Sequence, residues 1–267
     1  MALVRIWLYH PPVMKRAIIR GARAGLRHAR RWIMRMEFVT LVLLVLLAGS
    51  IHFFVELADD VLEGDTRELD EWIILGMRNP DDLADPVGPP WLEEMIRDIT
   101  GLGGIGVLSL VTLGVAGYLG LAGKRHAMVL VLAAVFGGMV ASQLLKWGFE
   151  RPRPDLVPHH SEVYTTSFPS GHSMVSAVTY LTLGALLARI NSRRRIKTYV
   201  LCLAVLVTVA VGVSRVYLGV HWPTDVVAGW SAGAAWAMAC WLAAIWLQKR
   251  GAIEAPESPA SVDAAKT

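Results

Sequence analysis

Polar residues whose types could take part in catalysis fall in three short stretches of an otherwise apolar part of the chain. The stretches are KWGFERPRP at 146–154, PSGH at 169–172 and SRVYLGVHWPTD at 214–225. They contain the cations Lys146, Arg153 and Arg215, and a planar guanidinium matches the geometry of phosphate oxygens. Three cations that converge at one surface would strongly favour an anionic ligand.

Two histidines and one carboxylate supply groups that could react. His221 precedes Asp225 by four residues, so the carboxylate can orient one ring nitrogen and make the other more nucleophilic. His172 follows Ser170 and Gly171 at the expected start of a helix, where free backbone N–H groups can bind an anion. Histidines without cysteines or a dense carboxylate cluster make a poor metal cage, so we expect no metal and no cofactor. The pattern favours phosphoryl transfer by a nucleophile and an acid.

Membrane-spanning helices are the elements that must position these residues. The chain has 267 residues, is 54% hydrophobic and has a mean hydropathy of +0.47, which indicates an integral membrane protein. A bilayer core of about 30 Å needs roughly 20 apolar residues per helix. Long enough apolar stretches lie at residues 38–57, 101–123, 127–147, 171–191, 198–218 and 224–247. We therefore expect an all-α integral membrane fold with six transmembrane helices.

The first apolar stretch ends in LLAGS, which resembles a signal-peptide cleavage site. The segment before it is much longer than an ordinary charged leader region, so we expect this stretch to be retained as a helix. Cys202 and Cys240 lie inside the fifth and sixth stretches. Neither a disulfide nor a cysteine metal site is expected there.

The distribution of basic residues predicts the orientation of the helices. Residues 1–36 contain Lys and Arg but no acid, and further basic turns follow the second, fourth and sixth stretches. Such an excess belongs on the cytoplasmic side, which places both termini there. The acidic loop 57–100 and the three polar stretches then fall on the outer face. In a bacterium, this would be an inner membrane protein with its site facing the periplasm or exterior.

Three regions complete the expected domain organisation. Residues 1–36 form a basic segment whose stretch 14–36 mixes Arg with apolar residues at helical spacing. That pattern is typical of a helix lying on anionic lipids, with a solvated tail as the alternative and no nucleic acid as a partner. Residues 37–250 form the membrane domain, and its outward loop contains two amphipathic stretches expected to be interfacial helices. The segment 251–267 lacks apolar periodicity and is expected to be disordered.

The three polar stretches together resemble the signature of the type 2 phosphatidic acid phosphatase superfamily. The likeness lies in Lys-x6-Arg-Pro from Lys146, Pro-Ser-Gly-His from Pro169, and Ser-Arg-x5-His-x3-Asp from Ser214, with no position departing from the pattern. A lone Lys or Arg at a helix end is more often a membrane anchor. It is the ordered combination with two histidines that makes the signature specific.

The resemblance implies a residue-by-residue mechanism without a metal. His221 would attack phosphorus and become a phosphohistidine, Asp225 would orient it, and His172 would protonate the leaving group. The groups expected to hold the nonbridging oxygens are Lys146, Arg153, Arg215, Ser170 and Gly171. The expected substrate is a lipid phosphate at the outer face of the membrane.

Several substrates and two other functions stay open at this stage. The resemblance suggests phosphatidic acid, phosphatidylglycerol phosphate or undecaprenyl diphosphate, and alternatively lipid A or sphingolipid phosphates in hydrolysis or phosphotransfer. A vanadate-dependent haloperoxidase shares the signature, but the spanning helices disfavour it. A phospholipid transporter is disfavoured because paired histidines indicate turnover.

Overall fold

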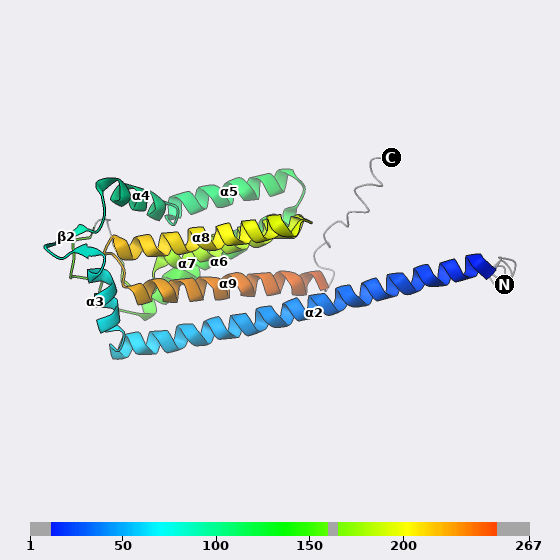
Figure 1. Ribbon diagram of the computed structural model, residues 1–267, viewed down its shortest axis with the longest axis horizontal. Helices are drawn as coiled ribbons and strands as arrows, with labels where there is room; N and C mark the ends of the chain where they lie inside the picture. Colours follow the sequence, from blue (N-terminus) through cyan, green and yellow to red (C-terminus); the bar gives the residue numbers. More distant parts are fainter. Residues whose placement is uncertain (1–11, 160–164, 250–267) are drawn as a thin grey trace. The chain divides into compact units, whose positions relative to one another are not determined.

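The computed structural model of the chain describes residues 12–159 and 165–249, which are mainly helical (Figure 1). The chain divides into two units, residues 1–45 and 46–267, and the helical bundle belongs to the second. The segment 251–267, expected to be disordered, lies outside the described residues.

Eight helices and two short strands make up the secondary structure of the described residues. The helices are α2 (Pro12–Glu63), α3 (Arg67–Leu75), α4 (Pro90–Gly101), α5 (Ile105–Leu121), α6 (Arg125–Gly148), α7 (Gly171–Ile190), α8 (Arg194–Tyr217) and α9 (Pro223–Lys249). The strands are β1 (Arg78–Asn79) and β2 (Asp82–Pro86). Helix α2 is longer than expected, because it includes both the amphipathic stretch and the first apolar stretch.

Within the described residues, five helical segments are long and apolar enough to cross a bilayer, or six if a bent pair is one span. The five are Phe38–Glu63 of α2, α6, α7, α8 and Pro223–Leu247 of α9. The bent pair is α4 and α5, whose axes differ by 51°. The apolar stretch expected to span at 101–123 forms α5, which begins at Ile105 and not at 101. The sequence GLGG at 101–104 separates α5 from α4, since glycine is a poor helix former.

Helix α7 forms the centre of the bundle and packs against α6, α8 and α9. Two glycines of α9 allow a close approach to α7. A Cβ atom added at Gly229 would lie 2.6 Å from the carbonyl oxygen of Ser170, and one added at Gly233 would lie 2.5 Å from that of Met174. The small residues therefore bring the first turns of α7 and α9 together, as Gly-x-x-x-Gly faces do in membrane helices.

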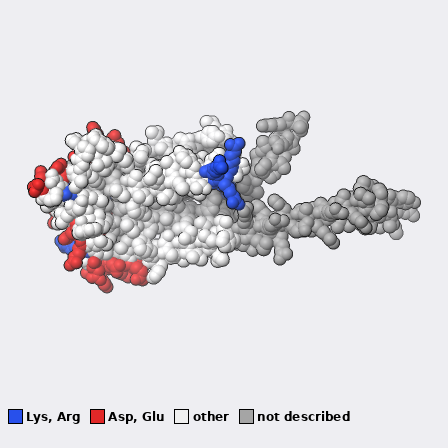
Figure 2. Space-filling view, in the orientation of Figure 1, with Lys and Arg blue, Asp and Glu red and all other residues white. Residues whose placement is uncertain are grey.

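The outward loop forms a polar cap at one end of the bundle. It contains α3, the antiparallel hairpin β1–β2 and α4, so both expected amphipathic helices form, whereas the hairpin between them was not predicted. Carboxylates gather over this end, and a basic patch lies at the opposite end, near the α7–α8 connection (Figure 2). The exposed side chains of Trp72 and Trp91 suit an interfacial position for α3 and α4.

Candidate active site

The three polar stretches meet beneath the cap because four helix ends lie there. Lys146 lies in the last turn of α6, and Gly171 opens α7. Arg215 lies in the last turn of α8, and Asp225 in the first turn of α9. Pro223 begins α9, and its fixed φ suits a first helical position. In Figure 1 this is the end near α3 and β2.

His221 and Asp225 form a buried hydrogen-bonded pair. Nδ1 of His221 lies 3.3 Å from Oδ2 of Asp225, and the residues are 2% and 0% exposed. The same oxygen accepts hydrogen bonds from the Trp222 backbone N–H, at 2.9 Å, and from the hydroxyl of Ser167. The backbone carbonyl of Asp225 accepts a 2.9 Å hydrogen bond from the Ser170 N–H. The carboxylate is thus held on several sides.

Arg153 determines the tautomer of His221. Its Nη1 lies 3.3 Å from Nε2 of His221 and donates to the carbonyl of Val220 at 2.6 Å. Because a guanidinium can only donate, Nε2 carries the lone pair and Nδ1 carries the hydrogen that points to Asp225. Burial lowers the pKa of His221 to about 3, although the hydrogen bond to Asp225 acts in the opposite direction. The imidazole is therefore neutral near pH 7, as a nucleophile must be.

Lys146 and Arg215 are buried and Arg153 is half-buried. None of these three predicted cations forms an ion pair with a carboxylate of the described residues. Lys146 Nζ donates to the carbonyl of Thr166 at 2.7 Å, and Arg215 Nη1 donates to Thr100 Oγ1 at 3.1 Å. Nε of Arg215 has no hydrogen-bond partner among the described residues. Lys146 lies close enough to Arg153 and Arg215 for their positive charges to repel its own. Three neighbouring cations, two buried and one half-buried, that lack ion pairs among the described residues make a strong anion site.

His172 and its neighbours lie beside these cations. It is the second residue of α7 and is within electrostatic range of Arg215, His221 and Lys146. A Cβ added at Gly103 would lie 3.3 Å from Cδ2 of His172, so the bend between α4 and α5 packs against the imidazole. A Cβ added at Gly171 would lie 3.4 Å from Cε of Lys146. The structure thus brings the eight residues selected from the sequence to one place.

Three further residues contact this site and were not selected from the sequence. Ser167 donates to Asp225, and Arg151 forms ion pairs with both Asp225 and Asp70, each at 2.7 Å. The repeated Arg-Pro dipeptide at 151–154 was the only signal for Arg151, and motif spacing favoured Arg153. Asp70 is one of many acids in the outward loop, so no local pattern distinguished it.

Metal binding has no obvious donor set in the described part of the chain. No group of three or more His, Cys, Asp or Glu side chains lies close enough there to hold an ion. The arrangement instead combines an anion site, a neutral imidazole aligned by a carboxylate and a second imidazole. Such a set can transfer a phosphoryl group to histidine and then to water.

Comparison with known proteins shows the family that shares these polar stretches. The profile of the PAP2 superfamily matches residues 127–249, which include all three polar stretches. Phosphatidylglycerophosphatase B of Bacillus subtilis is 38% identical over 149 residues, or 54% of this chain and 71% of that protein. An undecaprenyl-diphosphatase of Sulfolobus acidocaldarius is 35% identical over 106 residues, or 39% of this chain and 46% of that protein.

A solved structure extends the likeness to the fold. The crystal structure of a transmembrane PAP2-type phosphatidylglycerolphosphate phosphatase from Bacillus subtilis has a TM-score of 0.69 with this chain, at 29% sequence identity. The alignment covers 75% of this chain and 96% of that structure. The similarity therefore includes the helices that surround the polar stretches as well as the stretches themselves.

Proposed function

This chain belongs to the PAP2 superfamily, and on that premise we propose how it works as a membrane lipid phosphatase. It hydrolyses a phosphomonoester or diphosphate of a lipid headgroup through a phosphohistidine intermediate. The observation that carries this proposal is the orientation of His221. Its Nδ1 faces Asp225, while Nε2 lies beside Arg153, which belongs to a cluster of cations with Lys146 and Arg215.

The reaction proceeds in two steps at one imidazole. Nε2 of His221 attacks phosphorus and the bond between phosphorus and the lipid oxygen breaks, while His172 gives that oxygen a proton. Water then attacks the phosphohistidine, His172 takes a proton from it, and phosphate leaves. Asp225 accepts the Nδ1–H hydrogen bond throughout and stabilises the positive charge on the ring.

The cations stabilise the phosphoryl group as it moves. Lys146, Arg153 and Arg215 bind the nonbridging oxygens, together with Ser170 and the backbone of Gly171 at the start of α7. Arg153 moves its donor from Nε2 of His221 to a phosphate oxygen when substrate binds. The unpartnered Nε of Arg215 supports this assignment, since buried donors usually have an acceptor.

The same proposal includes a topology. The α4–α5 pair counts as one bent span, which makes six, and both termini lie in the cytoplasm. The acidic cap and the basic opposite end support an outward-facing site, which in a bacterium lies on the periplasmic or exterior side of the inner membrane. The basic segment 1–36 binds anionic lipids at the cytoplasmic surface.

Candidate substrates are phosphatidic acid, phosphatidylglycerol phosphate and undecaprenyl diphosphate, followed by lipid A and sphingolipid phosphates. The first test is phosphate release by purified protein from each lipid in mixed micelles, with and without EDTA. We expect release to continue in EDTA and to be lost in His221→Ala. Bromide oxidation with vanadate, lipid transport without phosphate release, or a requirement for added Mg²⁺ would each contradict the proposal.

A further inference from the structure

We infer that Arg151 is a positioning residue of this reaction, because it ties the Asp225 that orients His221 to Asp70 in the cap. The inference rests on the proposed function of the His221–Asp225 pair. It adds a role for the outward loop, which lies outside the three motifs. It also adds a role for Arg151 of the first Arg-Pro dipeptide, whereas the signature uses Arg153 of the second.

The guanidinium of Arg151 bridges two buried carboxylates. Nη1 donates to Oδ1 of Asp225 at 2.7 Å, and Nη2 donates to Oδ2 of Asp70 at 2.7 Å. The arginine side chain is 14% exposed, whereas both carboxylates are fully buried. Such a planar fork can serve two acceptors at fixed angles, which an ammonium group cannot do.

Asp70 in turn holds the start of α9. Its Oδ1 accepts the backbone N–H of Thr224 at 3.0 Å, and its Oδ2 accepts the hydroxyl of Thr224 at 2.7 Å. The first N–H groups of a helix lack partners within the helix, so a carboxylate from α3 acts as the cap of α9. Asp225 is the next residue, and its backbone position therefore depends on the same contact.

The bridge leaves each oxygen of Asp225 with its own partners. Oδ2 accepts hydrogen bonds from His221, Ser167 and the Trp222 N–H, whereas Oδ1 accepts one from Arg151. The guanidinium carbon also lies 5.4 Å from the centre of the Trp222 ring, which restrains the fork from a third direction. Rotation of the carboxylate away from His221 would break the 2.7 Å contact with Arg151.

Charge balance gives the bridge a second effect. Two carboxylates around one guanidinium have a net charge of −1, and this charge lies beside a neutral His221. When His221 becomes a phosphohistidine with its Nδ1–H retained, the ring gains a positive charge. The ionised Asp225 stabilises this positive charge. Arg151 supports that effect, because an opposite charge at 2.7 Å favours the ionised carboxylate.

This role predicts an effect on turnover rather than on phosphate binding. Arg151→Ala should lower kcat by about 10- to 100-fold. This is the loss typical when a hydrogen-bond partner that orients a metal-ligating side chain is removed, and Arg151 likewise acts by orientation. Arg151→Lys should recover only part of that loss. Competitive inhibition by inorganic phosphate should stay within about threefold of wild type, because the anion ligands are untouched.

Asp70→Asn tests whether the cap acts through Arg151. It keeps an acceptor for Thr224 but removes the charge, and it should lower kcat in the same direction. In the Asp70→Asn/Arg151→Ala double variant, kcat should be no lower than in Arg151→Ala alone, because coupled residues are not additive. The matched control is Arg67→Ala, which breaks the exposed 2.8 Å pair with Glu71 on the same helix and should leave kcat unchanged.

The measurements are kcat, KM and phosphate inhibition in detergent, on variants whose melting temperature and monodispersity match wild type. Wild-type kcat in folded Arg151→Ala would overturn the inference, as would parallel losses of kcat and phosphate affinity. Independent, multiplying effects of the two substitutions would overturn the bridge. If Arg151→Ala does not fold, wild-type kcat in folded Asp70→Asn would overturn it instead. If the proposed function is wrong, wild-type protein will release no phosphate, which none of the outcomes above requires. The inference about Arg151 would then be wrong as well.

Discussion

His221 and His172 differ in their neighbours, and this difference decides what each substitution should do. His221 has a carboxylate at 3.3 Å and a pKa lowered by burial to about 3, so its lone pair is available across the neutral range. His172 lies at the start of α7 among cations. The first environment suits a nucleophile and the second suits a group that meets a departing oxygen.

The two roles can be separated by the leaving group. A lipid alkoxide needs a proton as it departs, whereas p-nitrophenolate does not. His172→Ala should therefore keep more of its normal rate with p-nitrophenyl phosphate than with a lipid phosphate, and His221→Ala should fail with both. The measurement is the rate of single-turnover cleavage of each substrate by each variant. Rapid quench traps the acid-labile phosphoenzyme as it forms. Equal impairment of His172→Ala on both substrates, or phosphoenzyme in His221→Ala, would contradict the assignment.

At the scale of helices, the contact between α7 and α9 holds the start of α7, which contains His172, near the start of α9, which contains Asp225. Gly233 allows that contact, because an added Cβ would lie 2.5 Å from a backbone oxygen of Met174. A backbone atom cannot move aside as a flexible side chain can. The site geometry therefore depends on Gly229 and Gly233, which lie outside the three motifs.

Gly233→Ala should lower the free energy of unfolding by about 1–3 kcal/mol, the usual cost of overpacking, and should also lower kcat. Gly117→Ala on α5 is the matched control, since its Cβ would meet nothing within 4 Å. Alanine favours helix over glycine by roughly 0.5–1 kcal/mol, so the control should be neutral or slightly stabilising. Thermal unfolding in detergent measures both. A wild-type melting temperature in Gly233→Ala would show that the helices can separate without cost.

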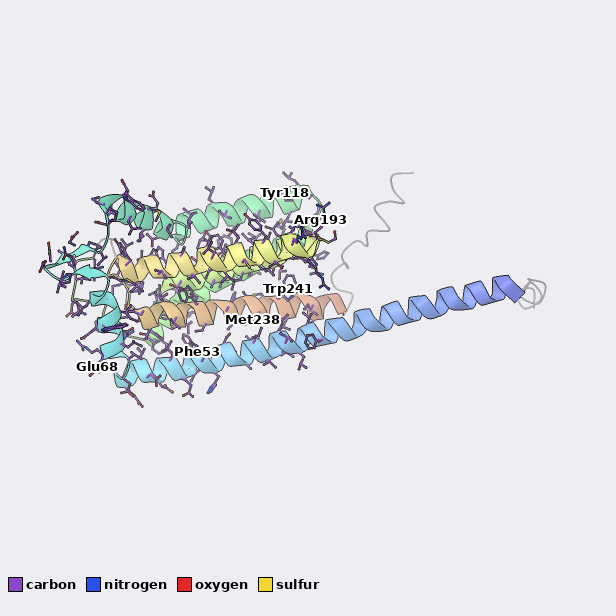
Figure 3. The ribbon with its side chains drawn as sticks, viewed as in Figure 1. Phe53, Glu68, Tyr118, Arg193, Met238 and Trp241 are labelled. Carbon is purple, nitrogen blue, oxygen red and sulfur yellow. The ribbon has the colours of Figure 1, made fainter. Side chains whose placement is uncertain are left out.

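At the scale of the whole molecule, the charges at the two ends of the bundle predict its orientation. Glu68 lies at the cap end and Arg193 at the opposite end (Figure 3). Both are exposed. An acidic end and a basic end are expected on the outer and cytoplasmic sides, respectively.

Single cysteines test this orientation after Cys202 and Cys240 are replaced. Glu68→Cys should react with a membrane-impermeant maleimide in intact cells, whereas Arg193→Cys should react only after lysis. Phosphatase activity of each variant confirms that it is folded. Labelling of Arg193→Cys in intact cells, with Glu68→Cys protected, would reverse the proposed topology.

The sequence alone determined the family, the set of candidate site residues and most of the helices. The spans α6, α7, α8 and α9 follow from apolar length, because a bilayer requires about 20 apolar residues in each helix. The order of helices then fixes which polar ends share a surface. Lys146, His172, Arg215 and His221 could therefore be placed together without knowledge of any side-chain contact.

Only the tertiary structure decided the contacts that align these residues. The bend between α4 and α5 brings Gly103 beside His172, a contact that helical periodicity does not report. Arg151 pairs with both Asp70 and Asp225, which lie far from it in the chain, and many other acids and arginines have the same local character. Helical periodicity and motif spacing report local order, whereas the selection of one carboxylate by one guanidinium depends on how separate helices pack.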